Sequence, residues 1–234
     1  MEAVPVFPQL DPVTLLCALC AMGLLTSAMA ASSARALPDF RWPLVRWSQA
    51  MLGLALSAAL YVLRGRAPDA LTFALPNVLL LHAVATVHIA YAHVLGRPAA
   101  PWWRETTVAV GTAGVAAVWL GGAPHGLAVF TIAAAVSANF GRASWLLLSR
   151  RGFRREPARM LSAAGVVAAT AVFGARALLA AAGQGDVMTM HARSLPQVSA
   201  LLVGALFVFT ASLGLFVLIH ERQRRMLEDS ASRD

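Results

Sequence analysis

The chain has 234 residues, of which 59% are hydrophobic and 13% are charged, and its mean hydropathy is +0.67. Soluble domains carry about 25% charged residues, so this composition excludes a disordered chain, a disulfide-stapled miniprotein and an ordinary soluble enzyme. The 19 basic residues, all arginine, outnumber the 11 acidic ones by 8, a surplus that nucleic-acid binding or the cytoplasmic loops of a membrane protein would explain.

Seven apolar segments follow one another along the chain, and a membrane helix needs about 20 such residues. In chain order they are 13–33, 43–63, 70–95, 106–120, 125–149, 160–182 and 196–219. Start signals precede some of them, as at Asp11 and Pro12, and glycines end others, as at Gly122 and Gly183. The sequence predicts an all-α integral membrane protein: an external segment 1–12, a seven-transmembrane-helix bundle over 13–219, and a cytoplasmic helical linker over 220–234.

The first segment contains both cysteines, Cys17 and Cys20. A C-x-x-C spacing occurs in redox and metal sites, but cysteine is also an ordinary small apolar residue of helices, and no second pair accompanies this one. A signal peptide begins with a basic region, whereas the residues before this segment include Glu2 and Asp11 and no arginine. We therefore expect a retained helix with no metal site.

The arginines predict the orientation of the bundle. With the N-terminus outside and the C-terminus in the cytoplasm, 15 arginines fall on the cytoplasmic side and 4 on the other. Cytoplasmic loops are enriched in basic residues, so this orientation explains the surplus without nucleic acid as a partner. Trp42, Trp47, Trp102 and Trp103 fall near the predicted cytoplasmic interface, where aromatic side chains gather.

The third segment carries four polar side chains: Asn77, His82, His88 and His93. His82 and His93 share a helix face but lie three turns apart, too far for one metal ion, and His82 and His88 point to different faces. We expect these histidines to form hydrogen bonds between helices, and haem ligation from two helices stays the alternative. Asn77, in the outer half of this segment, and His82, near its middle, are candidate signal-sensing residues.

Arg176 lies late in the sixth segment, toward the outer face. An ionised group at such depth usually faces the bundle interior or water, and the alternative is a side chain that snorkels to the interface and pairs with Asp186 or Asp69. Arg176 and Asp186 are therefore further signal-sensing candidates. Asn139 and Arg142 in the fifth segment are expected to be structural.

Small residues gather in the fourth and sixth segments, among them Gly111, Gly114 and Gly165. Close helix packing in membranes favours such residues, so both segments are predicted to lie in the interior. The chain has no internal repeat, the usual sign of an inverted-repeat transporter. It also lacks the common nucleophile, zinc-protease, P-loop and dinucleotide motifs, so we expect neither enzyme activity nor a cofactor.

After Ile219 the chain continues with good helix formers and no helix breaker. The seventh helix is therefore predicted to run on into the cytoplasm. One interpretation is a solvated basic tail. The other is a transmitter toward a cytoplasmic output, beginning with His220, Glu221 and Arg222.

Short motifs occur in order along the chain. They are Leu10-Asp11-Pro12-Val13-Thr14-Leu15-Leu16, Asn77-Val78-Leu79-Leu80-Leu81, Gly96-Arg97-Pro98, Arg176-Ala177-Leu178-Leu179, and Glu221-Arg222 before a polar helix. In these the chain resembles the membrane-embedded N-terminal sensor region of bacterial GGDEF proteins, the diguanylate cyclases that make cyclic di-GMP. Residues 227–234 are similar to the linker that enters the cyclase domain, and Asp234 matches the first residue of its D-x-L-T-G-L-x-N-R motif.

The resemblance implies a sensor or anchor in the bacterial inner membrane that forms a homodimer and acts on a cytoplasmic output domain in cis or in trans. It places Asn77 and Arg176 at positions that match the family, whereas His82 and His88 match no family pattern. The sequence ends before a GGDEF motif, a nucleotide pocket or metal carboxylates, so cyclase activity is not implied. A small multi-helix transporter or channel is the alternative, and a membrane enzyme or haem carrier is a third class.

Overall fold

The computed structural model describes residues 10–97, 101–149, 156–188 and 193–232, apart from the side chains of residues 101, 186 and 187. Within these ranges the chain is all-α and contains seven main helices. They are α1 (Pro12–Ala36), α2 (Arg41–Val62), α3 (Leu75–Val94), α4 (Pro101–Gly121), α5 (His125–Leu148), α6 (Pro157–Leu179) and α7 (Leu195–Ala231). Short π or 3-10 segments precede α3 (Ala70–Ala74) and follow α6 (Ala180–Gln184 and Gly185–Met188).

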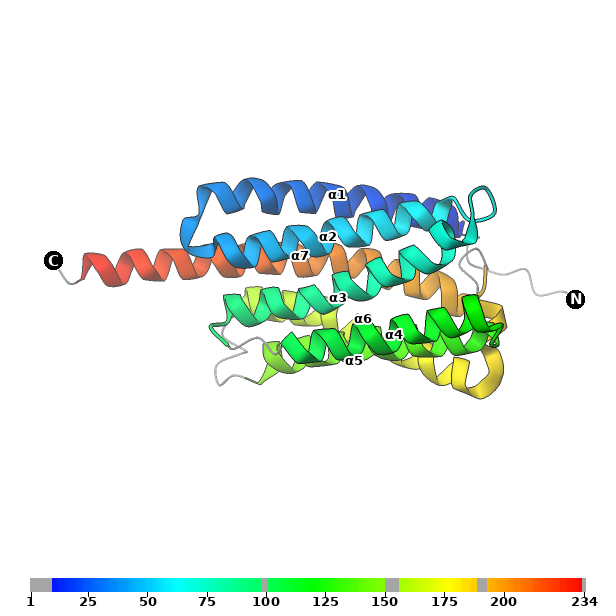
Figure 1. The fold of residues 1–234 in the computed structure, drawn as a ribbon. Coiled ribbons are helices and arrows are strands. Elements are labelled where there is room, and N and C mark those ends of the chain that lie inside the picture. The colour runs from blue at the N-terminus through cyan, green and yellow to red at the C-terminus, as the bar shows by residue number, and fades with distance from the viewer. Residues whose placement is uncertain (1–9, 98–100, 150–155, 189–192, 233–234) are drawn as a thin grey trace, which may run out of the picture.

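The helices lie side by side in one bundle, and α1 begins at the end opposite to the one from which α7 projects (Figure 1). We call these the N end and the C end of the bundle. Six helices form a ring in the order α1, α2, α3, α5, α6, α7, which closes where α7 packs against α1. Helix α4 packs outside this ring against α3 and α5, so the prediction that the fourth segment is an interior helix is wrong.

Helix boundaries follow the start and stop signals of the sequence. The Asp11 carboxylate accepts hydrogen bonds from the Thr14 backbone N–H (3.0 Å) and hydroxyl (3.1 Å), which caps α1. Gly122 and Gly183 follow α4 and α6 with φ of 64° and 84°, a conformation that glycine adopts without a steric penalty. Helix α4 begins five residues before its apolar run, because Pro101 suits a first turn and the next residues are compatible with a helix.

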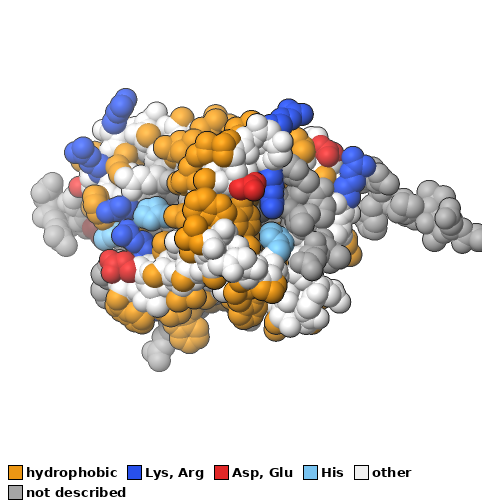
Figure 2. Space-filling view, turned by 45° about the vertical axis from the view of Figure 1, so that its right-hand side comes forward, with side chains coloured by type: hydrophobic (Ala, Val, Ile, Leu, Met, Phe, Trp, Pro, Cys, Tyr) orange, Lys and Arg blue, Asp and Glu red, His pale blue; other side chains and the backbone are white. Residues whose placement is uncertain are grey.

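Five of the seven helices are long and apolar enough to cross a membrane: those within Pro12–Ala36, Ala70–Val94, His125–Leu148, Pro157–Gln184 and Leu195–Ala231. Hydrophobic side chains form a band across the middle of the face shown in Figure 2, flanked on both sides by charged residues and histidines. Large apolar residues such as Leu25, Trp145 and Leu178 are exposed. This is the pattern of a multi-pass membrane protein.

The C end of the bundle is closely packed. Trp47 is fully buried, donates to the Ser212 hydroxyl at 3.2 Å and packs edge-on against Tyr91. The aromatic-belt prediction is therefore wrong for this residue, because α2 turns it toward α3 and α7. A Cβ atom on Gly214 of α7 would lie 2.2 Å from Ser162 Oγ and 2.8 Å from the Ala158 carbonyl oxygen of α6, so only glycine permits this approach.

Candidate functional site

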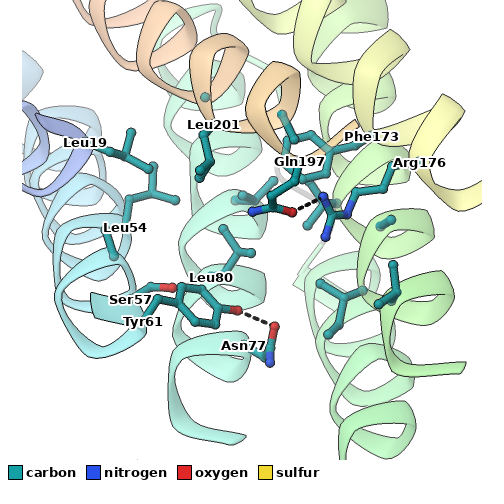
Figure 3. A pocket seen from close by; sticks show the side chains of 18 of the residues that line it. Leu19, Leu54, Ser57, Tyr61, Asn77, Leu80, Phe173, Arg176, Gln197 and Leu201 are labelled. Atoms are coloured by element: carbon teal, nitrogen blue, oxygen red, sulfur yellow. Dashed lines mark hydrogen bonds between the residues drawn. The ribbon is translucent and has the colours of Figure 1, made fainter. Parts of the chain in front are cut away.

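A cavity of about 110 Å³ lies inside the N end of the bundle, between the six helices of the ring. Its walls are mostly apolar, as a ligand pocket's usually are. Figure 3 shows apolar side chains directed toward it from α1, α2, α3, α6 and α7, namely Leu19, Leu54, Leu80, Phe173 and Leu201. An apolar cavity of this size has room for a small organic molecule.

The first polar group at the cavity joins α2 to α3. The Tyr61 hydroxyl donates to Asn77 Oδ1, and Asn77 Nδ2 donates to the Phe73 carbonyl at 2.6 Å. Ser57 donates to the Pro76 carbonyl at 2.8 Å. Pro76 has no backbone N–H, and the π segment Ala70–Ala74 directly precedes α3. Such local departures from α geometry are frequent at functional sites.

The second polar group joins α6 to α7. Arg176 donates to Gln197 Oε1 at 2.5 Å and to the Met188 carbonyl at 2.7 Å, and its side chain lies inside the bundle with the residue 8% exposed. The structure therefore places Arg176 in the interior and not at the interface as a snorkelling residue. Asp69 is exposed and forms no ion pair with it, and the side chain of Asp186 lies outside the described residues.

The two polar groups face the same cavity from different sides (Figure 3). Two residues predicted from the sequence, Asn77 and Arg176, thus lie in one site although α3 and α6 are far apart in the chain. Tyr61 and Gln197 complete the site, although neither was predicted from the sequence. Both are polar residues near the ends of apolar segments, which is the signal that would have pointed to them.

His82 is not part of this site. It lies five residues after Asn77 on α3, a rotation of about 140° around the helix axis, and is exposed on the side of the bundle. Asn77, by contrast, is buried and lines the cavity. His82 is therefore placed away from the other signal-sensing candidates.

The other histidines of α3 form hydrogen bonds between helices, as predicted. Buried His88 accepts from Arg142 of α5 at 3.2 Å, and His93 accepts from Trp42 of α2 at 2.9 Å. Arg142 also lies 5.0 Å from the centre of the Trp103 ring. These contacts hold α3 against its neighbours and account for both histidines without a ligand.

No three His, Cys, Asp or Glu side chains of the described residues are placed so that they would hold a metal ion. Cys17 is exposed, Cys20 is half-buried, and both are free thiols. The polar groups at the cavity are two guanidinium groups, an imidazole, a phenol, two amides and a hydroxyl. Such groups bind a ligand by hydrogen bonding and charge, so the geometry is suited to recognition.

Helix α7 connects the cavity to the far side of the bundle. It contributes Gln197, Leu201 and Gly204 to the cavity wall and continues without a break to Ala231, a length of 37 residues. The predicted continuation of the seventh helix past Ile219 is confirmed. The transmission candidates lie on this continuation, with His220 exposed and both Glu221 and Arg222 half-buried.

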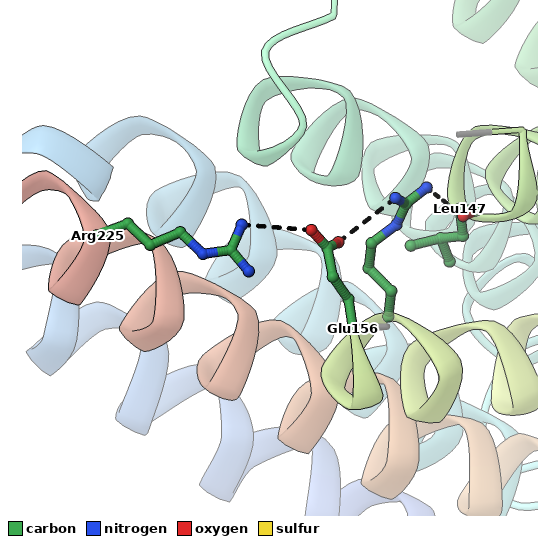
Figure 4. A network of polar contacts seen from close by, with 4 residues as sticks. Leu147, Glu156 and Arg225 are labelled. Carbon is green, nitrogen blue, oxygen red and sulfur yellow. Dashed lines mark hydrogen bonds and ion pairs between the residues drawn. The ribbon is translucent and has the colours of Figure 1, made fainter. Parts of the chain in front are cut away.

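A polar network attaches the α7 continuation to the C end. Arg225 pairs with Glu156, and Glu156 pairs with Arg159, each at 3.4 Å (Figure 4). Arg159 also donates to the Leu147 carbonyl at the end of α5. The network therefore joins α5, α6 and α7 where α7 leaves the bundle.

Comparison with known proteins adds no relative: no family model, curated protein or solved structure matches the chain.

Proposed function

We propose that this protein is a sensor module of the bacterial inner membrane in which occupancy of the cavity is transmitted by α7 to a cytoplasmic output of the diguanylate-cyclase type. One observation carries the proposal: the helix that lines the cavity with Gln197 and Leu201 is the same unbroken helix that extends beyond the C end. A change in its position at the cavity is therefore transferred to the output side without an intervening joint.

The proposal includes seven membrane crossings. Besides the five apolar helices, α2 has 22 residues and α4 has 21, and at about 1.5 Å per residue both match a hydrocarbon core of about 30 Å. An odd number of crossings agrees with the start of α1 and the end of α7 at opposite ends (Figure 1). The arginine distribution favours an external N end and a cytoplasmic C end.

A sensor requires two arrangements of the bundle and a ligand that binds one of them more tightly. The cavity allows such a difference, because side chains around it have space into which they can move. The closely packed C end does not deform gradually, so we propose that α7 shifts as a unit between two packings.

The alternative, a transporter or channel, needs a polar path across the membrane. Toward the C end, the described core beyond the cavity is closed by buried apolar side chains, including Met51, Leu215 and Leu218. This closure favours the sensor over the transporter.

The coupling is testable without a known ligand, by filling the cavity. Gly204 lines the cavity and a Cβ there would meet nothing within 4 Å, so Gly204→Leu places a side chain in it. With both cysteines replaced by alanine, nitroxide labels are attached to cysteines substituted for Ser32 and Arg224. Double electron–electron resonance in nanodiscs then measures the distance between α1 and the α7 continuation.

We expect the Gly204→Leu protein to shift this distance distribution. Gly121→Leu is the matched control, because Gly121 ends α4 away from the cavity and also has open space around it; it should leave the distribution unchanged. Identical distributions in all three proteins would refute transmission by α7.

The output is tested by joining a diguanylate cyclase domain after Asp234. Cyclase domains act in pairs, so the proposal includes a homodimer. Gly204→Leu should change the rate of cyclic di-GMP formation, and Gly121→Leu should not. An unchanged rate of cyclic di-GMP formation in both variants would contradict the proposed connection to a cyclase.

A further inference from the structure

We propose that the cavity binds a small monocarboxylate with an apolar body, and that Arg176 binds its carboxylate. This inference rests on the proposed function, because it takes the cavity as the site that receives the signal. It adds the chemical class of the ligand.

The charge of the cavity points to an anion. Two arginines line it, Arg176 in the interior and half-buried Arg64, whereas no acidic side chain of the described residues does. A buried cation is costly unless a counter-charge accompanies it. The described partners of Arg176 are neutral, the Gln197 amide oxygen and the Met188 carbonyl oxygen. An anionic ligand would supply a counter-charge that no described side chain at the cavity provides.

The donors at the cavity favour a carboxylate in particular. Arg176 uses one N–H of each terminal nitrogen in its described hydrogen bonds, and a guanidinium has five. The remaining N–H groups suit the two oxygens of a carboxylate, which arginine binds in a planar arrangement. A phosphate carries more charge and needs more donors than a wall so rich in leucine and phenylalanine provides.

The rest of the ligand must be apolar and small. The remainder of the wall is formed mainly by side chains such as Leu19, Leu80 and Leu201, which leave the body of a ligand without polar partners. By comparison with benzene, whose six carbon atoms occupy an apolar protein cavity of about 150 Å³, a cavity of about 110 Å³ suits an apolar body of roughly four to five carbon atoms beside the carboxylate. Hexanoate is therefore the probe, and 1-hexanol is its uncharged counterpart.

Isothermal titration of the full chain in nanodiscs at neutral pH, where hexanoate is ionised, measures the binding. Hexanoate should bind at least about tenfold more tightly than 1-hexanol, since hydrogen bonds to charged groups contribute more than neutral ones. Arg176→Gln should weaken hexanoate binding about tenfold to hundredfold. Arg66→Gln is the matched control, because exposed Arg66 lies on the α2–α3 connection and its loss changes the net charge equally.

Gly204→Leu provides a test that does not depend on the stability of the Arg176 variant. By occupying the cavity it should abolish hexanoate binding, while Gly121→Leu should keep it. Equal affinities for hexanoate and 1-hexanol, or unchanged affinity in Arg176→Gln, would overturn the proposal. Inorganic chloride or phosphate that displaces hexanoate at equal concentration would also overturn it, because the apolar body would then contribute nothing.

The length of the acid separates two sources of the same carboxylate. Among free acids, those with about six carbon atoms should bind best, and binding should disappear when the chain is too long for the cavity. Binding of octadecanoate but not of hexanoate would instead indicate a membrane fatty acid and would overturn the small, enclosed ligand. If hexanoate does not bind but Gly204→Leu still shifts α7, only the ligand class fails. If α7 does not shift, the proposed function fails whatever the titration shows.

Discussion

The two ends of the bundle differ in packing along the same helix. At the N end a Cβ on Gly204 would meet nothing within 4 Å, whereas ten residues later a Cβ on Gly214 would lie 2.2 Å from Ser162 Oγ. Helix α7 is therefore loosely packed at the cavity and tightly packed against α6 toward the C end. A loosely packed region can accept a ligand, and a tightly packed one transmits a displacement instead of absorbing it.

The ends also differ in how they treat a buried arginine. Helix α6 has Arg159 near its start, 1% exposed and paired with the Glu156 carboxylate, and Arg176 near its end, 8% exposed. The described partners of Arg176 are neutral oxygens. Arg159 therefore has a counter-charge within the protein, whereas we propose that Arg176 takes its counter-charge from a ligand.

The largest expected effect compares two leucines of α7. Leu215, fully buried at the C end, should cost about 2–5 kcal/mol of unfolding free energy when changed to alanine. Leu201→Ala should cost less, because Leu201 is 6% exposed and already faces the cavity, so fewer contacts are lost. Reversible unfolding in mixed micelles measures both. Equal losses would contradict the difference in packing.

A second pair of substitutions adds a single methyl group at each end. Gly214→Ala should destabilise the protein by about 1–3 kcal/mol, because its Cβ meets the backbone of α6. Gly204→Ala should stabilise it by roughly 0.5–1 kcal/mol through its better helix propensity. The same unfolding titration provides the measurement. An unchanged free energy of unfolding in Gly214→Ala would show that α6 and α7 can move apart at the C end without loss of stability.

A smaller effect is expected where α7 leaves the bundle. Arg225→Gln removes the tertiary ion pair with Glu156, and Arg224→Gln removes the pair with Glu228 inside α7. Both arginines are exposed, as is Glu228, while Glu156 is half-buried. Each pair should therefore contribute about 0.2–1 kcal/mol and weaken with salt. Only Arg225→Gln should raise the mobility of a nitroxide label near residue 227. Equal mobility in both variants would show that the network of Figure 4 does not attach the α7 continuation to the bundle.

The smallest effect concerns the start of α1 at the N end. The pKa of Asp11 is lowered below its ordinary value of 3.8, mainly by the hydrogen bond from the Thr14 backbone N–H and further by the one from the Thr14 hydroxyl. The stabilisation of α1 by the charged cap is therefore fully present above pH 3.8, and it is lost as the pH falls through the lowered pKa of Asp11. Protection of the Thr14 amide from hydrogen exchange, corrected for the intrinsic rate, should fall in acid.

Two variants separate the charge from the cap itself. Asp11→Asn keeps a capping oxygen and should remove the pH dependence while protection stays. Asp11→Ala should lower protection at every pH. Persistent pH dependence in Asp11→Asn would assign the titration to another group.

Most helix positions were predictable because hydropathy and start and stop signals act locally. The third and fifth segments, 70–95 and 125–149, agree closely with the observed helices. The start of α4 was misplaced because hydropathy detects apolar residues, and a helix continues through Trp102 and Arg104 when its backbone allows it. The place of α4 outside the ring was missed because small residues indicate close contact but not the number of neighbours.

The sequence by itself determined the all-α class, the long apolar helices and the continuation of α7, because composition, periodicity and the absence of helix breakers are properties of short segments. It also singled out Asn77 and Arg176 as polar residues that an apolar helix retains at a cost. Only the tertiary structure brought these two to one cavity with Tyr61 and Gln197, and turned His82 away from it. That depends on how helices rotate and cross when they pack, which is decided by contacts between residues far apart in the chain.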